Sequence, residues 1–500
     1  MISRSTFARS VLCAVSGLGL AAAFPPYDVG PLAFVSIAPL LYVWRGATPR
    51  RAAWYGLVFG LVFFGVLLEW SRYFGAIAIA PLVLGEAAFI AGVGALAVLM
   101  ERRGVRSVWL VAAAWVVVEA LRARFPFGGL PWGEVGVALH DFAPARALAS
   151  LGGVALVSFV VVACNGFVVD AAVAICRHTR RGLVVAAAGL AALAVASFIA
   201  DVTRFEGQVT GSIRFALLQG NDQDRTLTPS EITGQYLTRR HLALARTLHG
   251  HYDLIVFPES ALEHDPEQDP QLRAELVGIA RAHGAVVVAN TRADAPDGGV
   301  LNANVAYNAD GHLQGLYAKQ HLVPFGEYVP FRNQLSFIGE LQQIPYDYEA
   351  GRRRVLFHAA HRPFATVICF ESAFASLVRA DVRDGAQFIV VTTNNRSYRR
   401  SGLAAQHLAL SQMRAAETAR AVLHASISGI TGVVDPDGSV HDMSRLFVNK
   451  VTTGTIPTTT GETLYVRLGD WVVAASALAL LGLGAWSVRR TRRSSVQGPS

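Results

Sequence analysis

Three residues in the C-terminal half of the chain have side chains that together could carry out acyl transfer. Glu259 comes shortly after one apolar run, Cys369 closes another, and Lys319 follows the second arm of an expected hairpin. A thiolate is a strong nucleophile, a carboxylate can take its proton, and an ammonium can stabilise the oxyanion of a tetrahedral intermediate. These residue types predict acyl transfer through a thioester on Cys369, with the backbone N–H of Phe370 as a second oxyanion donor.

Cys369 is the single cysteine in the polar part of the chain. Of the four cysteines, Cys13, Cys164 and Cys176 lie in or at the ends of apolar runs, where a cysteine usually acts as a small hydrophobic residue. A lone cysteine in a domain outside the cytoplasm has no disulfide partner within that domain. Its presence is explained either by packing or by a nucleophilic role, and the second explanation is the sharper hypothesis.

An α/β core must position these three residues. Expected strands alternate with helical patterns, which indicates a layered α/β domain, and ligands of such domains bind at the carboxyl ends of strands. The expected strands are 213–219, 254–257, 285–289, 305–307, 313–317, 366–369, 388–392, 422–427 and 432–434, and the expected helices are 230–248, 271–283 and 403–421. The histidines of this region show no metal-ligand spacing, so neither a metal nor a cofactor is expected.

The composition indicates a membrane protein. Hydrophobic residues make up 52% of the 500 residues and charged residues only 16%, against about 25% in soluble domains. This excludes a wholly cytosolic enzyme, a disordered chain and a disulfide scaffold. A spanning helix needs about 20 apolar residues, and eight spans are expected near 7–23, 28–44, 52–71, 76–100, 106–122, 148–175, 183–200 and 471–488.

This distribution predicts three parts: a helical bundle over residues 1–200, a catalytic domain over 201–470, and a last span with a basic tail over 471–500. Arginines occupy every second loop of the bundle and the tail, which places both termini in the cytoplasm and the middle domain outside it. The segment 125–133 is expected to be re-entrant or interfacial. A cleavable signal peptide is the alternative for 7–23, but no small-residue cleavage site follows it.

Basic residues do not cluster with stacking aromatics on one polar face, so the net charge of +8 gives no indication of nucleic-acid binding. Most of the positive charge instead lies in loops between the expected spans and indicates their orientation in the membrane.

The motifs around the three residues resemble those of the nitrilase, or carbon–nitrogen hydrolase, superfamily. Its Glu-Lys-Cys triad is similar to Glu259, Lys319 and Cys369 in their local contexts, and the most specific run is the twelve residues 319–330. The layout of bundle, domain and final anchor resembles the apolipoprotein N-acyltransferase branch over nearly the whole chain. The resemblance implies an αββα sandwich for the domain.

The resemblance also implies a reaction at a bacterial inner membrane. A membrane phospholipid would donate a fatty acyl chain to Cys369, and the α-amine of the N-terminal diacylglyceryl-cysteine of an apolipoprotein would accept it. Glu259 would be the general base and Lys319 the oxyanion stabiliser, with Glu327 and Glu371 as supporting carboxylates. For those two supporting residues, a purely structural ion-pair role is the alternative.

Three places depart from the family pattern: Phe370 replaces a frequent tyrosine, the usual Lys-Trp pair is absent from 221–225, and the usual Asn-Asp-Ala-Trp-Phe-Gly stretch is changed at 394–399. Two alternatives stay open: a membrane-tethered amidase, which would use the same three residues with water, and a non-catalytic scaffold, which the changes at 394–399 motivate. A transporter is a more distant alternative. The apolar residues of 331–345, among them Leu335 and Phe337, are expected to reach towards lipid.

Overall fold

The computed structural model describes residues 4–223, 228–296 and 298–496. The chain separates into two compact units, one formed by Met1–Arg72, Ala76–Arg204 and Leu468–Ser500 and the other by Tyr73–Gly75 and Phe205–Arg467. The divisions after Arg204 and Arg467 fall close to the expected ones after residues 200 and 470. The short piece Tyr73–Gly75, which belongs to the second unit, was not anticipated.

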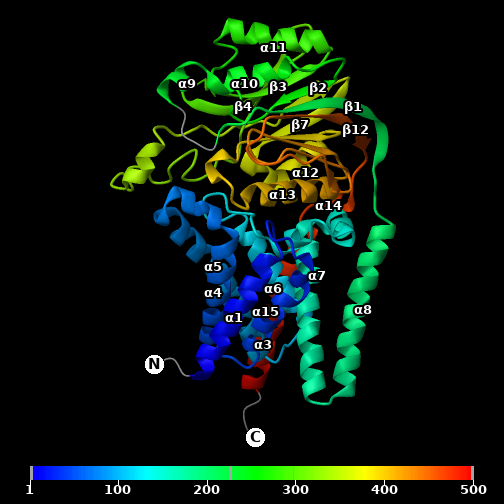
Figure 1. The fold of residues 1–500 in the computed structure, drawn as a ribbon. Coiled ribbons are helices and arrows are strands. Elements are labelled where there is room, and N and C mark those ends of the chain that lie inside the picture. Colours follow the sequence, from blue (N-terminus) through cyan, green and yellow to red (C-terminus); the bar gives the residue numbers. More distant parts are fainter. Residues whose placement is uncertain (1–3, 224–227, 297, 497–500) are drawn as a thin grey trace. The chain divides into compact units, whose positions relative to one another are not determined.

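The first unit is helical (Figure 1). Its elements are α1 (Arg4–Ala22), η1 (Gly30–Leu32), α2 (Ala33–Ser36), α3 (Ala38–Trp44), α4 (Pro49–Leu67), η2 (Glu69–Phe74), α5 (Ala76–Arg102), α6 (Val108–Arg122), η3 (Val135–Leu139), α7 (Ala143–Cys176), α8 (Arg180–Val202) and α15 (Trp471–Val496). In the described part of the chain, five helices are long and apolar enough to cross a membrane: α1, α4, α5, α7 and α8. The chain is therefore a membrane protein.

The expected count of eight spans is not confirmed. The region 28–44 is broken into η1, α2 and α3, because each piece is interrupted near a proline or a tight turn. Helix α6 has only 15 residues, and the apolar part of α15 ends at Trp486. Helix α7 bends where Gly152 and Gly153 leave helical geometry.

Small residues let helices α4 and α5 approach closely. A Cβ on Gly56 would lie 2.7 Å from the carbonyl oxygen of Ile90, and one on Gly60 would lie 2.7 Å from the Cα of Ala87. Neither contact leaves space for a side chain. Such close backbone approach is typical of helices that associate in lipid, where packing replaces the hydrophobic effect.

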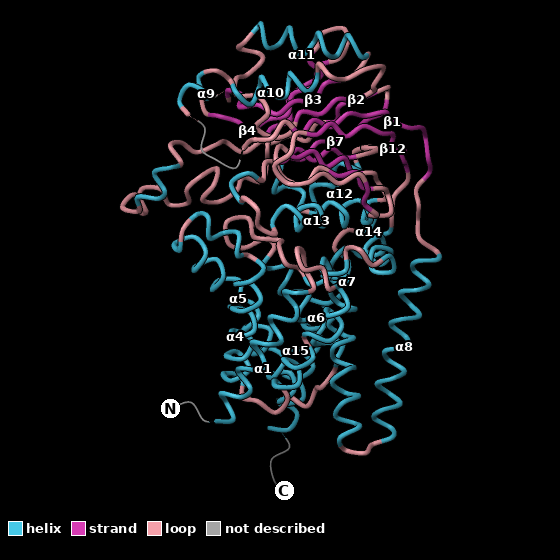
Figure 2. Tube along the Cα trace, in the orientation of Figure 1, coloured by secondary structure: helices cyan, strands magenta, loops and turns pink. Residues whose placement is uncertain are grey.

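The second unit contains two six-stranded sheets (Figure 2). The first has the order β12-β1-β2-β3-β4-β5 and the second β11-β10-β9-β8-β7-β6. The strands are β1 (Gln208–Gln219), β2 (Leu254–Phe257), β3 (Val286–Asp294), β4 (Val300–Tyr307), β5 (Leu313–Ala318), β6 (Leu356–Ala359), β7 (Arg362–Ile368), β8 (Ile389–Thr393), β9 (Val422–Ser426), β10 (Gly432–Val434), β11 (Val440–His441) and β12 (Lys450–Thr460). The neighbours β1-β2-β3 and β7-β8-β9 run parallel.

A buried apolar layer joins the two sheets and helices cover their outer faces. Phe215 and Ile456 of the first sheet share one core cluster with Phe364 and Leu423 of the second. Helices α10 (Tyr236–Ala245) and α11 (Pro270–His283) pack on the first sheet through a second cluster that includes Leu276. Helices α12 (Ala375–Arg383) and α13 (Leu403–Thr418) pack on the second sheet. The expected αββα sandwich is confirmed.

Strands β6, β11 and β12 and helix α12 were not expected from the sequence, and one expected helix is divided. The predicted helix 230–248 is split into α9 (Pro229–Thr233) and α10, because Gln235 between them adopts a left-handed backbone conformation. Strand β12 was missed, since its Thr-rich sequence has little apolar signal; it forms by pairing antiparallel with β1 along its whole length. Pairing with β1 thus stabilises a strand that the sequence of β12 alone favours only weakly.

Candidate functional site

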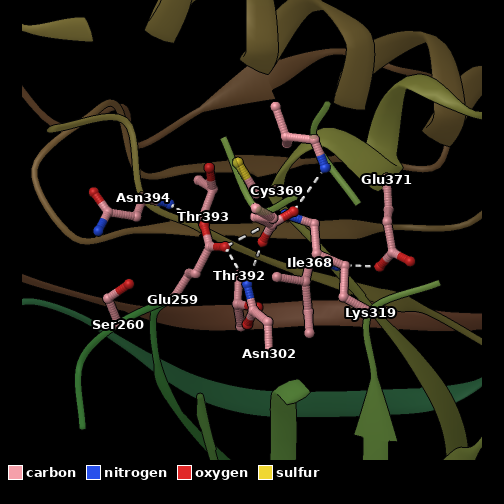
Figure 3. Close-up of polar contacts among 12 residues, drawn as sticks. Glu259, Ser260, Asn302, Lys319, Ile368, Cys369, Glu371, Thr392, Thr393 and Asn394 are labelled. Carbon is pink, nitrogen blue, oxygen red and sulfur yellow. Dashed lines mark hydrogen bonds and ion pairs between the residues drawn. The ribbon is translucent and has the colours of Figure 1, made fainter. Parts of the chain in front are cut away.

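The three candidate residues follow strands of both sheets. Glu259 lies two residues after β2 and Lys319 directly after β5, both in the first sheet, whereas Cys369 directly follows β7 in the second. Because the sheets pack face to face, strand ends of the two sheets meet at one place. Figure 3 shows the side chains converging there.

A buried cation lies between two carboxylates at this place. The Lys319 side chain is 1% exposed, and its Nζ donates to Glu327 Oε1 at 2.9 Å and lies 3.6 Å from Glu259 Oε1. Burial by itself lowers the pKa of Lys319, but the charges of Glu327 and Glu259 outweigh it and raise the pKa well above its ordinary value. Lys319 is therefore a fixed ammonium group.

Two amide groups orient Glu259. Asn302 Nδ2 donates to Glu259 Oε1 at 2.8 Å and to Glu327 Oε1 at 2.9 Å, so one amide bridges both carboxylates. The backbone N–H of Asn394 donates to Glu259 Oε2 at 2.7 Å. Burial, followed by the nearby charge of Glu327, raises the pKa of Glu259 although Lys319 lowers it. The carboxylate is thus held in place and made more basic than an exposed one.

Cys369 begins the short 3₁₀ helix η5 (Cys369–Ala373) with a left-handed backbone conformation, φ 52°. Burial raises the pKa of its thiol to about 12; the Glu259 charge adds to the increase, and Lys319 opposes it. The resting sulfur is therefore a thiol, and its attack on a carbonyl requires a base that takes the proton. Phe370 occupies the next position of η5, where a backbone N–H has no partner within the helix.

Glu371 holds the backbone on both sides of the site. It accepts hydrogen bonds from the N–H groups of Gln320 and His321, directly after the lysine, and of Ile368, directly before the cysteine. The Tyr317 hydroxyl also donates to it. Burial raises the pKa of Glu371 to about 7. Glu371 thus fixes the segments that carry Lys319 and Cys369.

His407 is a buried residue at the site that sequence reasoning missed. Its Nε2 lies 2.9 Å from the carbonyl oxygen of Cys369 and 2.8 Å from Ser372 Oγ, and a carbonyl can only accept, so Nε2 carries the hydrogen. Burial lowers the pKa of His407 to about 4, which keeps it neutral, so its Nδ1 is an acceptor. The Thr393 hydroxyl lies 3.3 Å from Nδ1 and can donate to it. The ring thus ties the backbone of Cys369 to the end of β8 (Ile389–Thr393).

Asn302 was also missed, because an asparagine inside a strand shows no pattern in the sequence. The only signal is the clustering of Asn290, Asn302 and Asn304 within two adjacent strands: Asn290 Nδ2 donates to Asn302 Oδ1 at 2.8 Å and to Asn304 Oδ1 at 3.1 Å. Three buried amides in a strand pair are unusual enough to mark a polar site.

The diverged segment 394–399 lies directly against the site. Besides the Asn394 backbone contact with Glu259, the segment contains the buried Tyr398, and burial raises the pKa of its hydroxyl. The Tyr398 ring packs edge-on against Phe74, with centroids 5.4 Å apart. In the other diverged segment, Asp222 pairs with Arg396 at 3.2 Å; positions 224 and 225 lie outside the described residues.

Aromatic rings lie in a row beside Cys369. Phe370 packs edge-on against Phe374 with centroids 5.0 Å apart, and Phe374 stacks on the His321 ring at 4.0 Å. An apolar group bound next to Cys369 would find an apolar wall there. Within the described residues, no group of three or more His, Cys, Asp or Glu side chains has a metal-binding arrangement.

Two family models match the chain. The N-terminal domain of apolipoprotein N-acyltransferases matches residues 16–167, and carbon–nitrogen hydrolase matches residues 216–465. The first match falls in the helical unit and the second in the sandwich. The two matches together cover both units.

Relatives match over almost the full length. An apolipoprotein N-acyltransferase of Methylococcus capsulatus is 32% identical over 98% of both chains, and one of Geobacter metallireducens is 29% identical over 95% of both. A crystal structure of a CN-hydrolase superfamily protein from Xanthomonas campestris, 22% identical, covers 49% of this chain and 91% of its own with a TM-score of 0.38. The chain belongs to the apolipoprotein N-acyltransferase family and is an acyltransferase of the carbon–nitrogen hydrolase superfamily.

Proposed function

We propose that the chain transfers a fatty acyl group from a membrane phospholipid, through a thioester on Cys369, to the N-terminal α-amine of a diacylglyceryl-modified apolipoprotein. Glu259 is the general base, and Lys319 with the backbone N–H of Phe370 stabilises the oxyanion. The observation that supports these roles is the fixed Lys319 ammonium between two buried carboxylates, beside a thiol that needs a base.

In the first half-reaction, the Cys369 thiol gives its proton to Glu259 as its sulfur attacks the ester carbonyl carbon of the phospholipid. The carbonyl oxygen becomes an oxyanion, which Lys319 stabilises as a pre-oriented charge in a dry site. The carbon–oxygen bond to glycerol then breaks. The leaving lysophospholipid alcohol takes the proton back from Glu259, and the acyl group remains on sulfur.

In the second half-reaction, the α-amine of the acceptor attacks the thioester carbonyl and gives a proton to Glu259. The carbon–sulfur bond breaks, an amide remains on the acceptor, and the sulfur recovers its proton from Glu259. Asn302 holds Oε1 of the Glu259 carboxyl group and the Asn394 backbone N–H holds Oε2, so the group keeps its orientation through both half-reactions. Glu327 keeps Lys319 charged and in place.

The experiment is to incubate purified protein with phospholipid carrying a labelled acyl chain and to measure a hydroxylamine-sensitive protein adduct. Cys369→Ala should form no adduct. Cys176→Ala, which removes an exposed thiol of the helical unit, should form the normal amount. An adduct that persists in Cys369→Ala would overturn the proposal.

The acceptor is tested by adding a diacylated lipopeptide to the isolated adduct. Transfer of the label to the peptide amine supports the N-acyltransferase reaction. Release of free fatty acid at the same rate with and without peptide would instead support hydrolysis, which is the reaction of an amidase with the same three residues.

Orientation in the bacterial inner membrane is part of the proposal. Basic residues in every second loop of the helical unit support cytoplasmic termini and an extracytoplasmic sandwich over about 201–470, followed by an anchor over 471–500. A green fluorescent protein fused after Ser500 should fluoresce, because this reporter folds in the cytoplasm. A dark fusion that is present in full amount in the membrane would contradict this orientation.

An exposed apolar arm supports contact with lipid. The Phe337 side chain is 81% exposed and that of Phe331 is 63% exposed, while Leu335 is partly buried, so neither Leu335 nor Phe337 lies deep in the α/β core. Exposed phenylalanines of this kind bind the interface of a bilayer. Phe337→Ser should lower acyl transfer from vesicles several-fold and leave transfer from a detergent-dispersed short-chain donor unchanged.

A further inference from the structure

A small cavity in the helical unit lies where α3 and α5 end and α6 begins. Its volume is about 90 Å³, and most of its wall is apolar. Its polar lining residues are Arg45, Glu101, Arg106, Ser107 and Asp170. None of the lining residues belongs to the unit that carries Cys369.

The two arginines of the cavity lining have N–H groups that form no hydrogen bond with the acceptors of the lining. Arg45 Nη2 donates to Asp170 Oδ1 at 2.6 Å, but Arg45 Nη1 is buried and has no protein partner. The Arg106 guanidinium lies 3.9 Å from Glu101 and 4.0 Å from Asp170, which is beyond hydrogen-bond distance. A buried N–H without an acceptor carries a desolvation penalty. A ligand that accepts a hydrogen bond from this group would remove that penalty.

The start of α6 adds further donors. Ser107 is the N-cap residue of this 15-residue helix, and its side chain makes no capping hydrogen bond. The first N–H groups of a helix have no partner within it, and the helix dipole places partial positive charge there. Helix N-termini bind phosphate and other anions for this reason.

The two carboxylates in the lining limit which ligand fits. Asp170 already accepts from Arg45, and Glu101 accepts from the backbone N–H of Gly46 at 3.3 Å. With two arginines and two acidic residues, the formal charge of the lining is balanced, so a ligand is held by directed N–H donors rather than by net charge. A phosphate has several acceptor oxygens and matches the planar fork of an arginine.

We propose that this cavity binds the phosphate of a phospholipid headgroup as a structural ligand, separate from the acyl donor at Cys369. The apolar wall suits the glycerol end of a lipid, and two of the lining helices, α5 and α7, are long and apolar enough to cross a bilayer. Free inorganic phosphate shares the same recognition chemistry, and the experiment distinguishes these two sources.

The test uses full-length, delipidated protein in detergent and measures binding by native mass spectrometry and by the melting temperature. The probes are phosphatidylglycerol, diacylglycerol with the same chains, and inorganic phosphate. Phosphatidylglycerol should bind and stabilise, and diacylglycerol should not. Stabilisation by phosphate alone to the same extent would identify free phosphate as the ligand, whereas stabilisation by the lipid only would identify the headgroup.

Variants locate the binding. Arg106→Gln should weaken phosphatidylglycerol binding by about tenfold, because it removes one charge-assisted contact. The matched control Arg103→Gln removes an exposed arginine of the same loop and should have no effect. Arg45→Gln with Asp170→Asn removes the second arginine without leaving its partner charged and alone.

Equal weakening by Arg106→Gln and Arg103→Gln would show diffuse charge attraction and overturn the proposal. Unchanged binding in both Arg106→Gln and the Arg45→Gln, Asp170→Asn double variant would overturn it as well. Equal binding of diacylglycerol and phosphatidylglycerol would remove the role of the phosphate and have the same consequence.

Discussion

In each of the two units, a fully buried cation lies close to two carboxylates. In the helical unit, Arg122 is 1% exposed and its Nη1 donates to Glu86 Oε2 at 2.9 Å, with Glu119 close by. In the sandwich, Lys319 is also 1% exposed and lies between Glu327 and Glu259. Both cations are buried to the same extent, and both have two carboxylates nearby. The burial and charge of the cation therefore do not distinguish a structural cluster from a catalytic one.

The neighbours make the difference. Arg122 also donates to the carbonyl oxygens of Leu130 and Trp132, and Glu119 accepts from Trp115 Nε1 and from a backbone N–H, so this cluster closes the loop after α6 onto the helices. This describes how the segment 125–133 is held; its re-entrant position in the membrane stays a prediction.

The Lys319 cluster has a thiol beside it. Cys369 interacts with the charges of both Lys319 and Glu259, whereas none of the partners described for Arg122 is a nucleophile. Lysine suits this position because its ammonium is a compact point charge, while the five-donor fork of arginine suits several fixed carbonyl partners. A buried ion cluster therefore indicates chemistry only where a reactive group is next to it.

The largest effect is expected from Cys369→Ala. Removing the nucleophile should lower acyl transfer by at least about 10³-fold, since the covalent route is lost. The melting temperature should change little, because one small, partly buried side chain is shortened. Transfer is measured with labelled phospholipid and a diacylated lipopeptide, and residual activity above one tenth of normal would contradict the assignment.

Arg122→Met is expected to affect stability and not chemistry. Loss of the buried cation leaves Glu86 without its ion-pair partner and Glu119 without the nearby positive charge; breaking such a cluster costs about 3–5 kcal/mol. The melting temperature in detergent should fall strongly, while the activity of each folded molecule stays near normal. Arg124→Met is the control, because Arg124 forms an exposed ion pair with Asp470, and such pairs contribute about 1 kcal/mol or less.

Asn302→Ala should lower the rate of adduct formation by about 10²-fold, because the single amide that bridges Glu259 and Glu327 is lost. The measurement is the rate of thioester formation in a single turnover. A large loss of melting temperature with an unchanged rate would show that Asn302 stabilises the fold and does not position the base.

The pH dependence separates the two carboxylates of the Lys319 cluster. Glu259 acts as a base only when ionised, so acylation should rise with pH through its pKa, which burial and Glu327 raise above the ordinary 4.5. Glu327→Gln removes the neighbouring negative charge and should move this rise to lower pH by roughly one unit. If the acylation rate of the variant rises at the same pH or at a higher pH, the charge of Glu327 does not raise the pKa of Glu259.

Sequence alone was sufficient for the class of fold and for choosing three candidate residues that the structure brings together. Strands that carry apolar residues and end in Glu259, Lys319 or Cys369 are local signals, and the αββα sandwich follows from their alternation with helices. The long apolar helices were also predictable, because a run of about 20 apolar residues is typical of a membrane-spanning helix. The count of spans was not, since the apolar region 28–44 is broken into η1, α2 and α3, and α6 has only 15 residues.

Only the tertiary structure decided how the site is held. Asn302, His407 and the Asn394 backbone N–H come from separate strands and helices, and no spacing in the chain connects them to Glu259 or Cys369. Glu371, expected as a supporting carboxylate or a purely structural partner, accepts hydrogen bonds from the backbone N–H groups that flank Lys319 and Cys369, and no spacing in the sequence predicts these bonds. The physical reason is that the reactive residue types are encoded locally, whereas the burial and hydrogen bonds that set their charge and orientation arise only when two sheets pack together.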